Sequence, residues 1–524
     1  MTLCLVACSM SCNNNSLNFS YCKKAIIMNI QYIKSNQSRV FPAKKMLLLL
    51  TSLATQSIWS SGMVAPSYAI DAANTANANA AEAKNPSTIV ANSAGLTHLL
   101  GTYFENNFLL VLPDFYYSEA KGYYFKSHVP IKGQTSGQVG HRIEAPSLFI
   151  SHQLTPSLFA GLGIYGGFGA DFDYPMNSVT RFNTNRVRIL SVSFNPNIAI
   201  KLNDHHSIGL GVYALWSRGT LRQFADAAYG VNSFANLFLP FLNGKYLVPD
   251  GSFEIYTTLR GTGVAYGYNL AWLWDVNDKV RLGLSYRSKS KAPFKGEAWW
   301  QAYSYGWDIP ILGAIIDDIY HRLGYVHHET VNFELKYPES WQLHAFWQVS
   351  DQLDLMANLA FFKDSRQKVL HIDWAHTKLV PDAQKRIPTL VPRRYTDVAI
   401  DFKDTWQASI GANYRYNDRI NLRGGIMYTP SSAKDNQGRA PAIPDNDRFM
   451  VGVGGDYHYN KHLTFNVSYN FLKQKTSKID NGSFCGKRQE YGAGALSCVD
   501  GRASTQANIK VKAHIVGVGL QYRF

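Results

Sequence analysis

Regular alternation of apolar and polar residues is the feature of this sequence that most limits its fold. It occurs in separate segments, for example 280–286, 406–414 and 463–471. Charged residues make up only 17% of the chain and aromatic residues 13%. No apolar run approaches the roughly 18 residues of a membrane helix, which excludes a polytopic helical membrane protein. A soluble β-sandwich also alternates, but the aromatic ends of the apolar faces and an export signal favour an all-β transmembrane barrel.

The spacing of short and long polar segments predicts the number of strands. Long irregular segments lie near residues 118–143, 171–184, 223–258, 300–328, 375–396, 432–446 and 480–504. Short turns alternate with them, at Thr155-Pro156, Asn203-Asp204, Asn277-Asp278, Ser350-Asp351, Asn417-Asp418 and Asn460-Lys461. Outer-membrane barrels have short periplasmic turns and long outer loops. With both termini periplasmic, this pattern predicts a 14-stranded antiparallel barrel.

The N-terminal region resembles an export signal. Lys44-Lys45 precede an apolar stretch that begins at Met46, and small residues lead to Ala69, which is the order of a secretory signal. We therefore expect residues 1–69 to be an N-terminal extension and signal peptide, with translation starting at Met28 or Met46 if not at residue 1. Of the six cysteines, only Cys485 and Cys498 follow this segment. Their position in one loop of an exported protein predicts a disulfide.

The charge distribution argues against nucleic-acid binding. The formal net charge is +15, and residues 1–69 hold six basic residues and no acidic one. The remaining positive charge is scattered through predicted strand ends and loops, whereas a nucleic-acid binder gathers it on one face.

The C-terminus alternates towards a terminal aromatic residue. Val518, Leu520, Tyr522 and Phe524 share one face of a predicted last strand. This pattern is typical of barrels that present their end to the barrel-assembly machinery, and closure removes the sheet edge. Upstream, the apolar residues from Ile509 to Ile515 have the opposite parity, which predicts a β-bulge near Ile515.

Several sequence blocks, in order along the chain, resemble the FadL family of outer-membrane transporters for long-chain fatty acids and other hydrophobic compounds. The blocks are 86–97, Tyr286-Arg287-Ser288 with Phe294-Lys295-Gly296, Pro338-Glu339-Ser340-Trp341, Phe402-Lys403-Asp404 and 443–449. The resemblance implies a small hatch at 70–101 inside a transmembrane barrel at 102–524. The segment 70–101 is otherwise open to interpretation as a disordered tail. The hatch motif is Asn92, Ser93, Ala94 and Gly95, with Ser93 where the family has proline.

Candidate ligand-binding residues follow from the same resemblance. Two outer loops are rich in apolar residues, which would form the walls of a capture groove: Phe234, Leu237, Phe238, Phe241, Tyr305, Trp307, Ile311, Leu312 and Ile315. The alternative is that these loops only pack on themselves. A carboxylate head group needs a cation, and the candidates are Arg218, Arg222, Gln223 and His371. Gln223 stands where the family has its pocket arginine, so a solvated strand-end arginine and a neutral substrate are alternatives.

The function implied by the resemblance is passive uptake of long-chain fatty acids or similar lipophilic compounds through a plugged barrel with a lateral exit. The expected location is the bacterial outer membrane, as a monomer in contact with lipid and lipopolysaccharide, without cofactor or metal. Uptake of aromatic hydrocarbons is the alternative within this class, and the long loops could also serve as an adhesin or phage receptor. An outer-membrane barrel enzyme such as a lipase is the alternative from another class, but no Gly-x-Ser-x-Gly motif accompanies the paired histidines at 205–206 and 327–328.

Overall fold

The structure is a computed structural model. It describes residues 67–124, 127–228, 231–232, 235, 241, 247–381, 390–400, 402–437, 439–481 and 503–524. The chain divides into two units, residues 1–53 and 54–524, and all described residues belong to the second. The predicted disulfide between Cys485 and Cys498, and nearly all of the predicted signal segment, lie outside the described residues. No helix of the described part is long and apolar enough to cross a membrane.

Strands dominate the described residues. They are β1 (Thr102–Tyr124), β2 (Gly137–Gln138), β3 (Ile143–Gln153), β4 (Leu158–Asp173), β5 (Arg186–Lys201), β6 (His206–Asp226), β7 (Glu254–Asn277), β8 (Val280–Arg287), β9 (Ser290–Ala302), β10 (His328–Tyr337), β11 (Ser340–Gln348), β12 (Leu353–Phe362), β13 (Val369–Pro381), β14 (Leu390–Ala399), β15 (Thr405–Asn417), β16 (Ile420–Thr429), β17 (Arg448–His458), β18 (Leu463–Gln474), β19 (Ser477–Asn481) and β20 (Ala503–Arg523). The helical segments are α4 (Ile70–Asn74), η2 (Asn79–Ala81), α5 (Thr88–Ala91), η3 (Ser93–His98), η5 (Tyr305–Asp308), α7 (Leu312–Arg322) and η6 (Asp364–Arg366).

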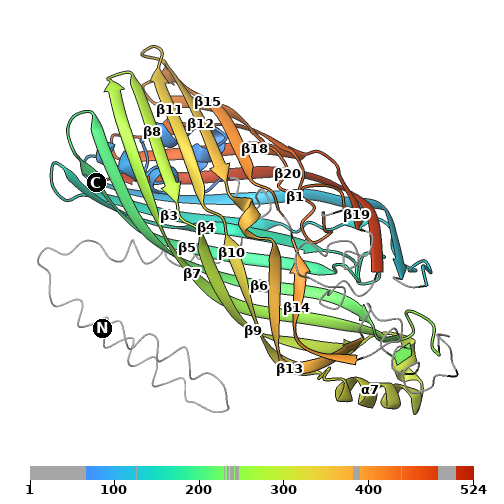
Figure 1. Cartoon of the computed structure of the whole chain (residues 1–524). Helices are drawn as coiled ribbons and strands as arrows, with labels where there is room; N and C mark the ends of the chain where they lie inside the picture. Colours follow the sequence, from blue (N-terminus) through green and yellow to red (C-terminus); the bar gives the residue numbers. More distant parts are fainter. Residues whose placement is uncertain are drawn as a thin grey trace, which may run out of the picture. The chain divides into compact units, whose positions relative to one another are not determined.

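The strands form one closed antiparallel barrel (Figure 1). Strand β1 pairs with β20 on one side and with β3 on the other, which closes the sheet. At several positions of the wall two strands follow one another end to end, as β8 and β9 do beside β7. The same holds for β10 with β11, β12 with β13, β14 with β15 and β18 with β19. Counted around its circumference, the wall has 14 strands, which confirms the predicted fold class.

Each predicted short turn joins two paired strands. Four of the turns are closed by an asparagine whose side-chain oxygen accepts hydrogen bonds from the backbone N–H groups two and three residues further on: Asn203, Asn277, Asn417 and Asn460. The hydroxyls of Thr155 and Ser350 act in the same way. Such local bonds are the reason these residue types favour turns. The chain end lies beside the turns, because the Phe524 N–H donates to the Thr102 carbonyl.

The outward face of the wall is apolar near the short turns and polar further from them. On β20, Val516 and Val518 are 43% and 54% exposed, as lipid-facing side chains must be. Beyond them the same face presents Lys510 and Lys512. The barrel therefore extends past the apolar belt on the long-loop side.

The predicted bulge near Ile515 is wrong. Ile515 pairs with Val111 on one side and Asn470 on the other, in an uninterrupted register. The apolar parity changes for another reason. Beyond the belt it is the inside of the barrel that is apolar, and Ile509 and Ile515 belong to a buried cluster that includes Phe115 of β1.

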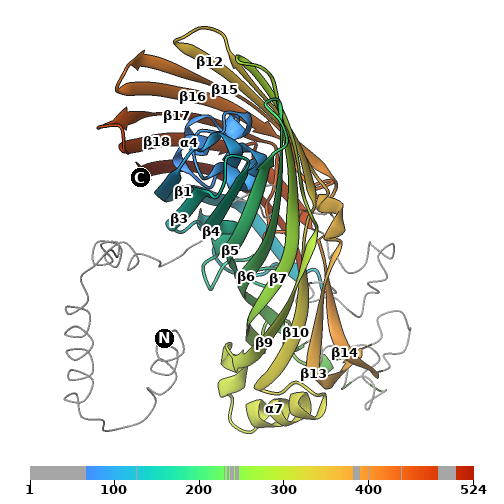
Figure 2. The ribbon, with the colours of Figure 1, turned by 90° about the vertical axis from the view of Figure 1, so that its left-hand side faces the viewer.

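On the long-loop side, the border of the apolar belt is marked by outward aromatic side chains on adjacent strands. Several of them pack ring against ring: Tyr268 with Tyr286, Tyr286 with Trp341, Trp341 with Phe361, and Trp406 with Tyr428. Aromatic rows of this kind lie at the membrane–water interface. On the long-loop side of this row, β8 ends and β9 continues the wall, and β10 in the same way continues the position of β11. Strands β9, β10, β13 and β14 thus continue the wall beyond the belt towards α7 (Figure 2).

Residues 67–99 lie inside the barrel at the end nearer the short turns (Figure 2). This segment, here called the hatch, contains α4, η2, α5 and η3 and consists mostly of small residues. Most of its side chains are buried, including Ile70, Ala73, Ala94 and Leu96. Ile70 packs on the inner wall with Leu109 of β1 and Met450 of β17. Small side chains let the hatch lie close to inward-facing glycines of the wall.

Candidate functional site

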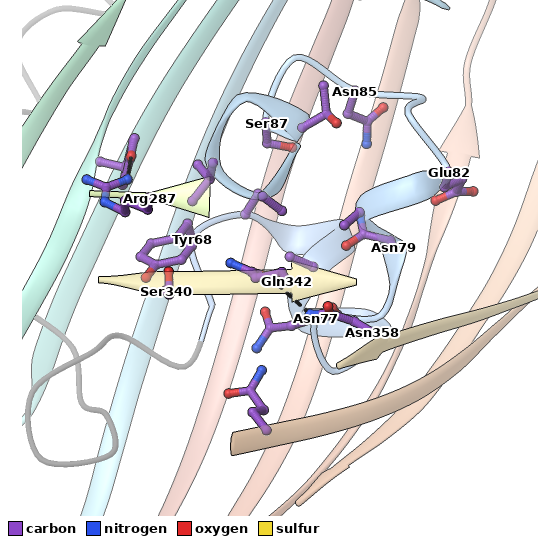
Figure 3. Close-up of a pocket in the computed structure, with 18 of the residues that line it drawn as sticks. Tyr68, Asn77, Asn79, Glu82, Asn85, Ser87, Arg287, Ser340, Gln342 and Asn358 are labelled. Carbon is purple, nitrogen blue, oxygen red and sulfur yellow. Dashed lines mark hydrogen bonds between the residues drawn. The ribbon is translucent and has the colours of Figure 1, made fainter. Parts of the chain in front are cut away.

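A cavity lies between the hatch and the inner wall (Figure 3). The hatch contributes Tyr68, Asn77, Asn85 and Ser87 among others, and β8, β11 and β12 contribute Arg287, Ser340, Gln342 and Asn358. Most lining residues are polar or small, and several alanines and Val90 supply apolar surface. A concave site with a few converging polar groups is the usual form of a small-molecule site.

Arg287 is a buried cation that lines this cavity, which Lys84 and Glu82 of the hatch also line. It ends β8, and its Nη1 donates a hydrogen bond to the Tyr165 hydroxyl at 2.9 Å. Its guanidinium carbon lies 3.9 Å from the centre of the Tyr213 ring. Its Nη2 is buried and has no hydrogen-bond partner, and no carboxylate of the described part forms an ion pair with it. An unneutralised buried guanidinium of this kind is suited to an anionic ligand, since arginine binds carboxylates with paired hydrogen bonds.

A chain of hydrogen bonds runs from Arg287 to the hatch. The Tyr165 hydroxyl donates to Asn195 Oδ1 at 3.1 Å, and Asn195 Nδ2 donates to Asn269 Oδ1 at 3.0 Å. Asn269 Nδ2 in turn donates to Ser93 Oγ of the hatch at 3.3 Å. All of these bonds lie between buried side chains or at the edge of the cavity, so they connect Arg287 to the predicted hatch motif through direct side-chain contacts.

The hatch motif contacts the wall directly. Asn92 caps η3 by accepting from the Ala94 N–H at 3.1 Å, and its Nδ2 donates to the Trp272 carbonyl of β7 at 3.1 Å. Gly209 of β6 faces the same motif. A Cβ at Gly209 would come within 2.5 Å of the Ala94 nitrogen and of Ser93 Oγ. Glycine is thus required here by the close approach of the hatch backbone.

A buried ion-pair cluster holds the other side of the hatch. Arg423 of β16 contacts Glu82 of the hatch (Nη1 to Oε2, 2.7 Å), Asp456 of β17 (Nε to Oδ2, 2.8 Å) and Asp71 of the hatch (Nη2 to Oδ2, 3.5 Å). Lys84 adds a 2.9 Å contact to Glu82. Removing one partner from such a cluster is costly because it leaves a buried charge uncompensated.

The pKa values of the two hatch carboxyl groups are shifted in opposite directions. Burial acts to raise the pKa of Glu82, but the charges and hydrogen bonds of Arg423 and Lys84 outweigh it and lower the pKa to about 2. Burial also raises the pKa of Asp71, and there the neighbouring carboxylates of Asp456 and Glu82 add to the rise while Arg423 opposes it. Arg423 thus forms its main ion pairs with Glu82 and Asp456.

The wall has a gap beside the cavity. Strands β3 and β4 pair only over the part nearer the short turn, up to Leu148 and Ile164. Beyond it, residues 143–147 pair only with β1, and residues 165–173 pair only with β5. An isolated bridge between Gly140 and Phe172 closes the gap at its far end. Unpaired strand edges are expensive inside a membrane, so this gap is a candidate opening in the wall.

A bulge in β4 lies next to this gap. The register with β5 shifts by one residue between Gly166 and Gly169. Tyr165 and Gly167 on this segment also line the cavity, so the bulge lies where cavity and gap meet.

The structure brings none of the four predicted head-group residues into the cavity. Arg218 and Arg222 share the outward face of β6 with Trp216. Gln223 is buried and donates to the Phe182 carbonyl at 2.6 Å. His371 faces outward on β13 and pairs with Asp397.

The predicted groove is described only in part. Phe234, Leu237 and Phe238 lie outside the described residues. Of the others, four are largely exposed: Phe241 (77%), Tyr305 (69%), Ile311 (78%) and Ile315 (50%). Trp307 and Leu312 instead pack on a buried cluster that joins α7 to the segment after β6, through Ile316, Tyr320 and Ala227. The loops therefore have a core of their own and also present apolar side chains to the outside.

Arg287 was missed as a candidate, although the sequence contains a signal for it. Leu282, Leu284 and Tyr286 alternate on one face of its strand, and that face is outward in the structure. Arg281 and Arg287 therefore point inward. A charged residue on the lumen side of a barrel, within a block that resembles a transporter family, is a stronger candidate than one on the outward face.

A closed 14-stranded barrel with an apolar outer belt, an inner hatch and an internal cavity defines the class of plugged outer-membrane transport barrels. Residues 51–524 match the family described as outer membrane protein transport protein (OMPP1/FadL/TodX), and the chain belongs to this family. It is an outer-membrane β-barrel transporter for hydrophobic compounds.

Similar proteins support this assignment. An outer membrane protein of Neisseria meningitidis serogroup B is 30% identical over 488 residues, covering 92% of this chain and 98% of that protein. A long-chain fatty acid transport protein of Salmonella typhi is 25% identical over 327 residues, covering 61% and 69%. The crystal structure of a Pseudomonas aeruginosa FadL homologue matches with a TM-score of 0.73 at 19% identity, covering 88% of this chain and 100% of that one.

Proposed function

We propose that the protein takes up long-chain fatty acids, or lipophilic acids of similar length, by passive diffusion, and that it is not an enzyme. The observation that carries the proposal is the buried Arg287, which lines the cavity and whose Nη2 has no hydrogen-bond partner in the described part. Burying a cation without a partner is unfavourable. The carboxylate of a fatty acid would supply the missing partner.

The proposed route begins at the exposed apolar side chains of the outer loops. Phe241, Tyr305 and Ile311 offer a surface on which an acyl chain would leave water. Each buried methylene group contributes about 0.8 kcal/mol, so capture of a long chain is favourable. The acid then reaches the cavity and binds Arg287 through its head group.

The proposed exit is the gap between β3 and β4. It borders the cavity through Tyr165 and Gly167, and it opens in the membrane-spanning part of the wall. A molecule that leaves here enters the bilayer sideways, and its apolar surface is never returned to water.

The hatch is proposed to respond to the ligand. A carboxylate at Arg287 competes with Tyr165 for the guanidinium, and Tyr165 starts the hydrogen-bond chain to Ser93. A ligand shifts a conformational equilibrium only through such differential contacts. Release of Tyr165 would weaken the attachment of the hatch to β6 and β7.

The test is uptake of radiolabelled oleate by a strain that lacks its own fatty acid transporter and expresses either the wild-type protein or R287Q. We expect uptake with the wild type and a loss of most of it with the variant. Toluene and methyl oleate are the comparison substrates. Uptake of both at the same rate as oleate, unaffected by R287Q, would instead favour aromatic hydrocarbons or other neutral compounds. Release of free fatty acid from a phospholipid by the purified protein would indicate the barrel enzyme.

A further inference from the structure

Five arginine side chains line one hollow on the outer surface of the wall. They are Arg186 and Arg188 of β5, Arg218 and Arg222 of β6, and Arg260 of β7, and the only other lining residues are Leu190 and Thr220. We call this set of five the arginine pocket. Its members occupy the same alternating positions as the exposed apolar residues Ile198, Leu210 and Leu270 of these strands. They therefore face the surroundings of the barrel and not its lumen.

The arginine pocket lies at the border of the apolar belt. On the outward face of β6, Arg218 directly follows Trp216, which is 41% exposed, and Val212 and Leu210 come before it. On β7, Tyr266 is 73% exposed and lies on the belt side of Arg260. Tryptophan and tyrosine mark the head-group level of a membrane. The pocket is on the long-loop side, where the outer leaflet lies in barrels of this class.

The positive charge of the pocket is only partly neutralised. Asp171 contacts Arg186 and Arg188, both at 3.4 Å, and Asp173 contacts Arg186 at 2.8 Å. In the part of the chain that the structure describes, no carboxylate forms an ion pair with Arg218, Arg222 or Arg260. Glu297 lies opposite Arg260 in the register with β9, but its carboxylate pairs with His328 at 3.8 Å.

Three guanidinium groups also have unused donors. The Nε–H groups of Arg186, Arg188 and Arg222 are buried and have no hydrogen-bond partner, and Arg188 Nε has only the 3.4 Å ion-pair contact to Asp171. The register places Arg186 directly opposite Arg222, and it places Arg188 opposite Thr220, between Arg218 and Arg222. Like charges on neighbouring strands repel one another. A bound anion with several acceptor oxygens would remove this repulsion and satisfy the free donors.

We propose that the arginine pocket binds the phosphate groups of a phosphorylated glycolipid of the outer leaflet, namely the lipid A part of lipopolysaccharide. Arginine forks match the oxygens of a phosphate. The apolar belt side chains, on the short-turn side of the pocket, give the acyl chains of such a lipid an apolar surface. A free phosphate would bind the arginines but would have no acyl chain to contact the belt. The inference rests on the outer-membrane location and is independent of the transported compound.

The test uses the full-length protein, purified in detergent and stripped of lipid by repeated detergent exchange. Native mass spectrometry measures binding of lipid A, and inorganic phosphate is titrated in parallel. The variant R218Q/R222Q/R260Q removes the three arginines that lack an acidic partner. The matched control K121Q/R142Q/R322Q removes the same charge from exposed positions elsewhere on the outer side. Heat-modifiable migration on gels shows that each variant forms a closed barrel.

We expect the arginine variant to bind lipid A at least about tenfold more weakly than the wild type, because several charge-assisted hydrogen bonds are lost. The control variant should bind as the wild type does. The variant R218K/R222K/R260K keeps the positive charges but loses the forked guanidinium groups. Its affinity for lipid A should lie between those of the wild type and the glutamine variant. Equal binding of lipid A by the folded glutamine variant would overturn the proposal. Inorganic phosphate that binds as tightly as lipid A would also overturn it and would identify a free-phosphate site.

Discussion

The hydrogen bond from Arg287 Nη1 to the Tyr165 hydroxyl, 2.9 Å long, connects the ligand cavity to two other parts of the barrel. Tyr165 directly precedes Gly166, after which the bulge of β4 begins at the wall gap, and it also begins the hydrogen-bond chain that ends at Ser93 of the hatch. One side chain thus borders the cavity, the opening and the hatch attachment. A ligand that draws Arg287 away from Tyr165 would act on all three.

Replacing Arg287 with glutamine should weaken binding of long-chain fatty acids. A hydrogen bond to a charged group is worth about 1.5–3 kcal/mol, so we expect the Kd for oleate to rise by about 10- to 100-fold. Tryptophan fluorescence quenching on purified protein measures it. R287K keeps the charge and should recover part of the affinity. Methyl oleate, which lacks the carboxylate, should bind wild type and R287Q alike. An oleate affinity unchanged in R287Q would contradict the assignment of this residue.

Adding a single methyl group at Gly209 should displace the hatch. The new Cβ would lie 2.5 Å from the Ala94 nitrogen, a distance that real Cβ atoms do not show, and because the contacted atom belongs to the backbone, the hatch itself must shift. We expect G209A to conduct ions steadily in planar bilayers, whereas the wild type stays closed. G424A is the matched control, because its Cβ would meet nothing closer than the Gly452 carbonyl at 3.8 Å. A silent G209A channel would show that the hatch is held mainly elsewhere.

The barrel is the part of this protein that the sequence predicts best. Its strands alternate, its turns carry asparagine, serine or threonine at fixed positions, and both signals are local. The error at Ile515 shows where local reasoning ends. The parity of apolar residues on the last strand changes because the wall rises above the membrane and its inside becomes apolar. That change depends on the position at which the strand leaves the bilayer, and the residues of a short segment alone do not specify this position.

The cavity was predictable only in outline. The hatch motif was found through its resemblance, but wall partners of this motif lie more than a hundred residues away, as Asn269 does from Ser93. The head-group candidates Arg218 and Arg222 were chosen for their closeness to a family motif, and one parity step decides between lumen and lipid. Counting inward and outward positions on each strand would have separated Arg287 from Arg218.

The hatch should loosen in acid. The pKa of Glu82 is lowered to about 2, so its ion pair with Arg423 stabilises hatch docking fully above the ordinary pKa of about 4.5. This contribution is lost as the pH falls through about 2. Hydrogen–deuterium exchange of the hatch peptides, corrected for the intrinsic rate at each pH, should therefore rise once the pH is lowered below about 4.5 towards 3, while the barrel strands remain protected. E82Q should show the faster exchange already at pH 7, and exchange that does not depend on pH in the wild type would contradict this role of Glu82.

Removing the bulge of β4 should close the lateral exit. The strand carries one extra residue between Gly166 and Gly169, and its edge towards β3 is unpaired from Tyr165 onwards. Deleting Gly167 would restore the regular register, straighten the strand and allow the ladder with β3 to extend. We expect oleate uptake to fall at least about tenfold, because the molecule loses its path into the bilayer, while oleate still binds to the purified protein. The control is deletion of Glu119, which lies at the register shift of β1 between Ser118 and Lys121, on the long-loop side of the barrel. Its deletion should leave uptake unchanged, and equal uptake by both deletion variants would mean that the substrate does not leave between β3 and β4.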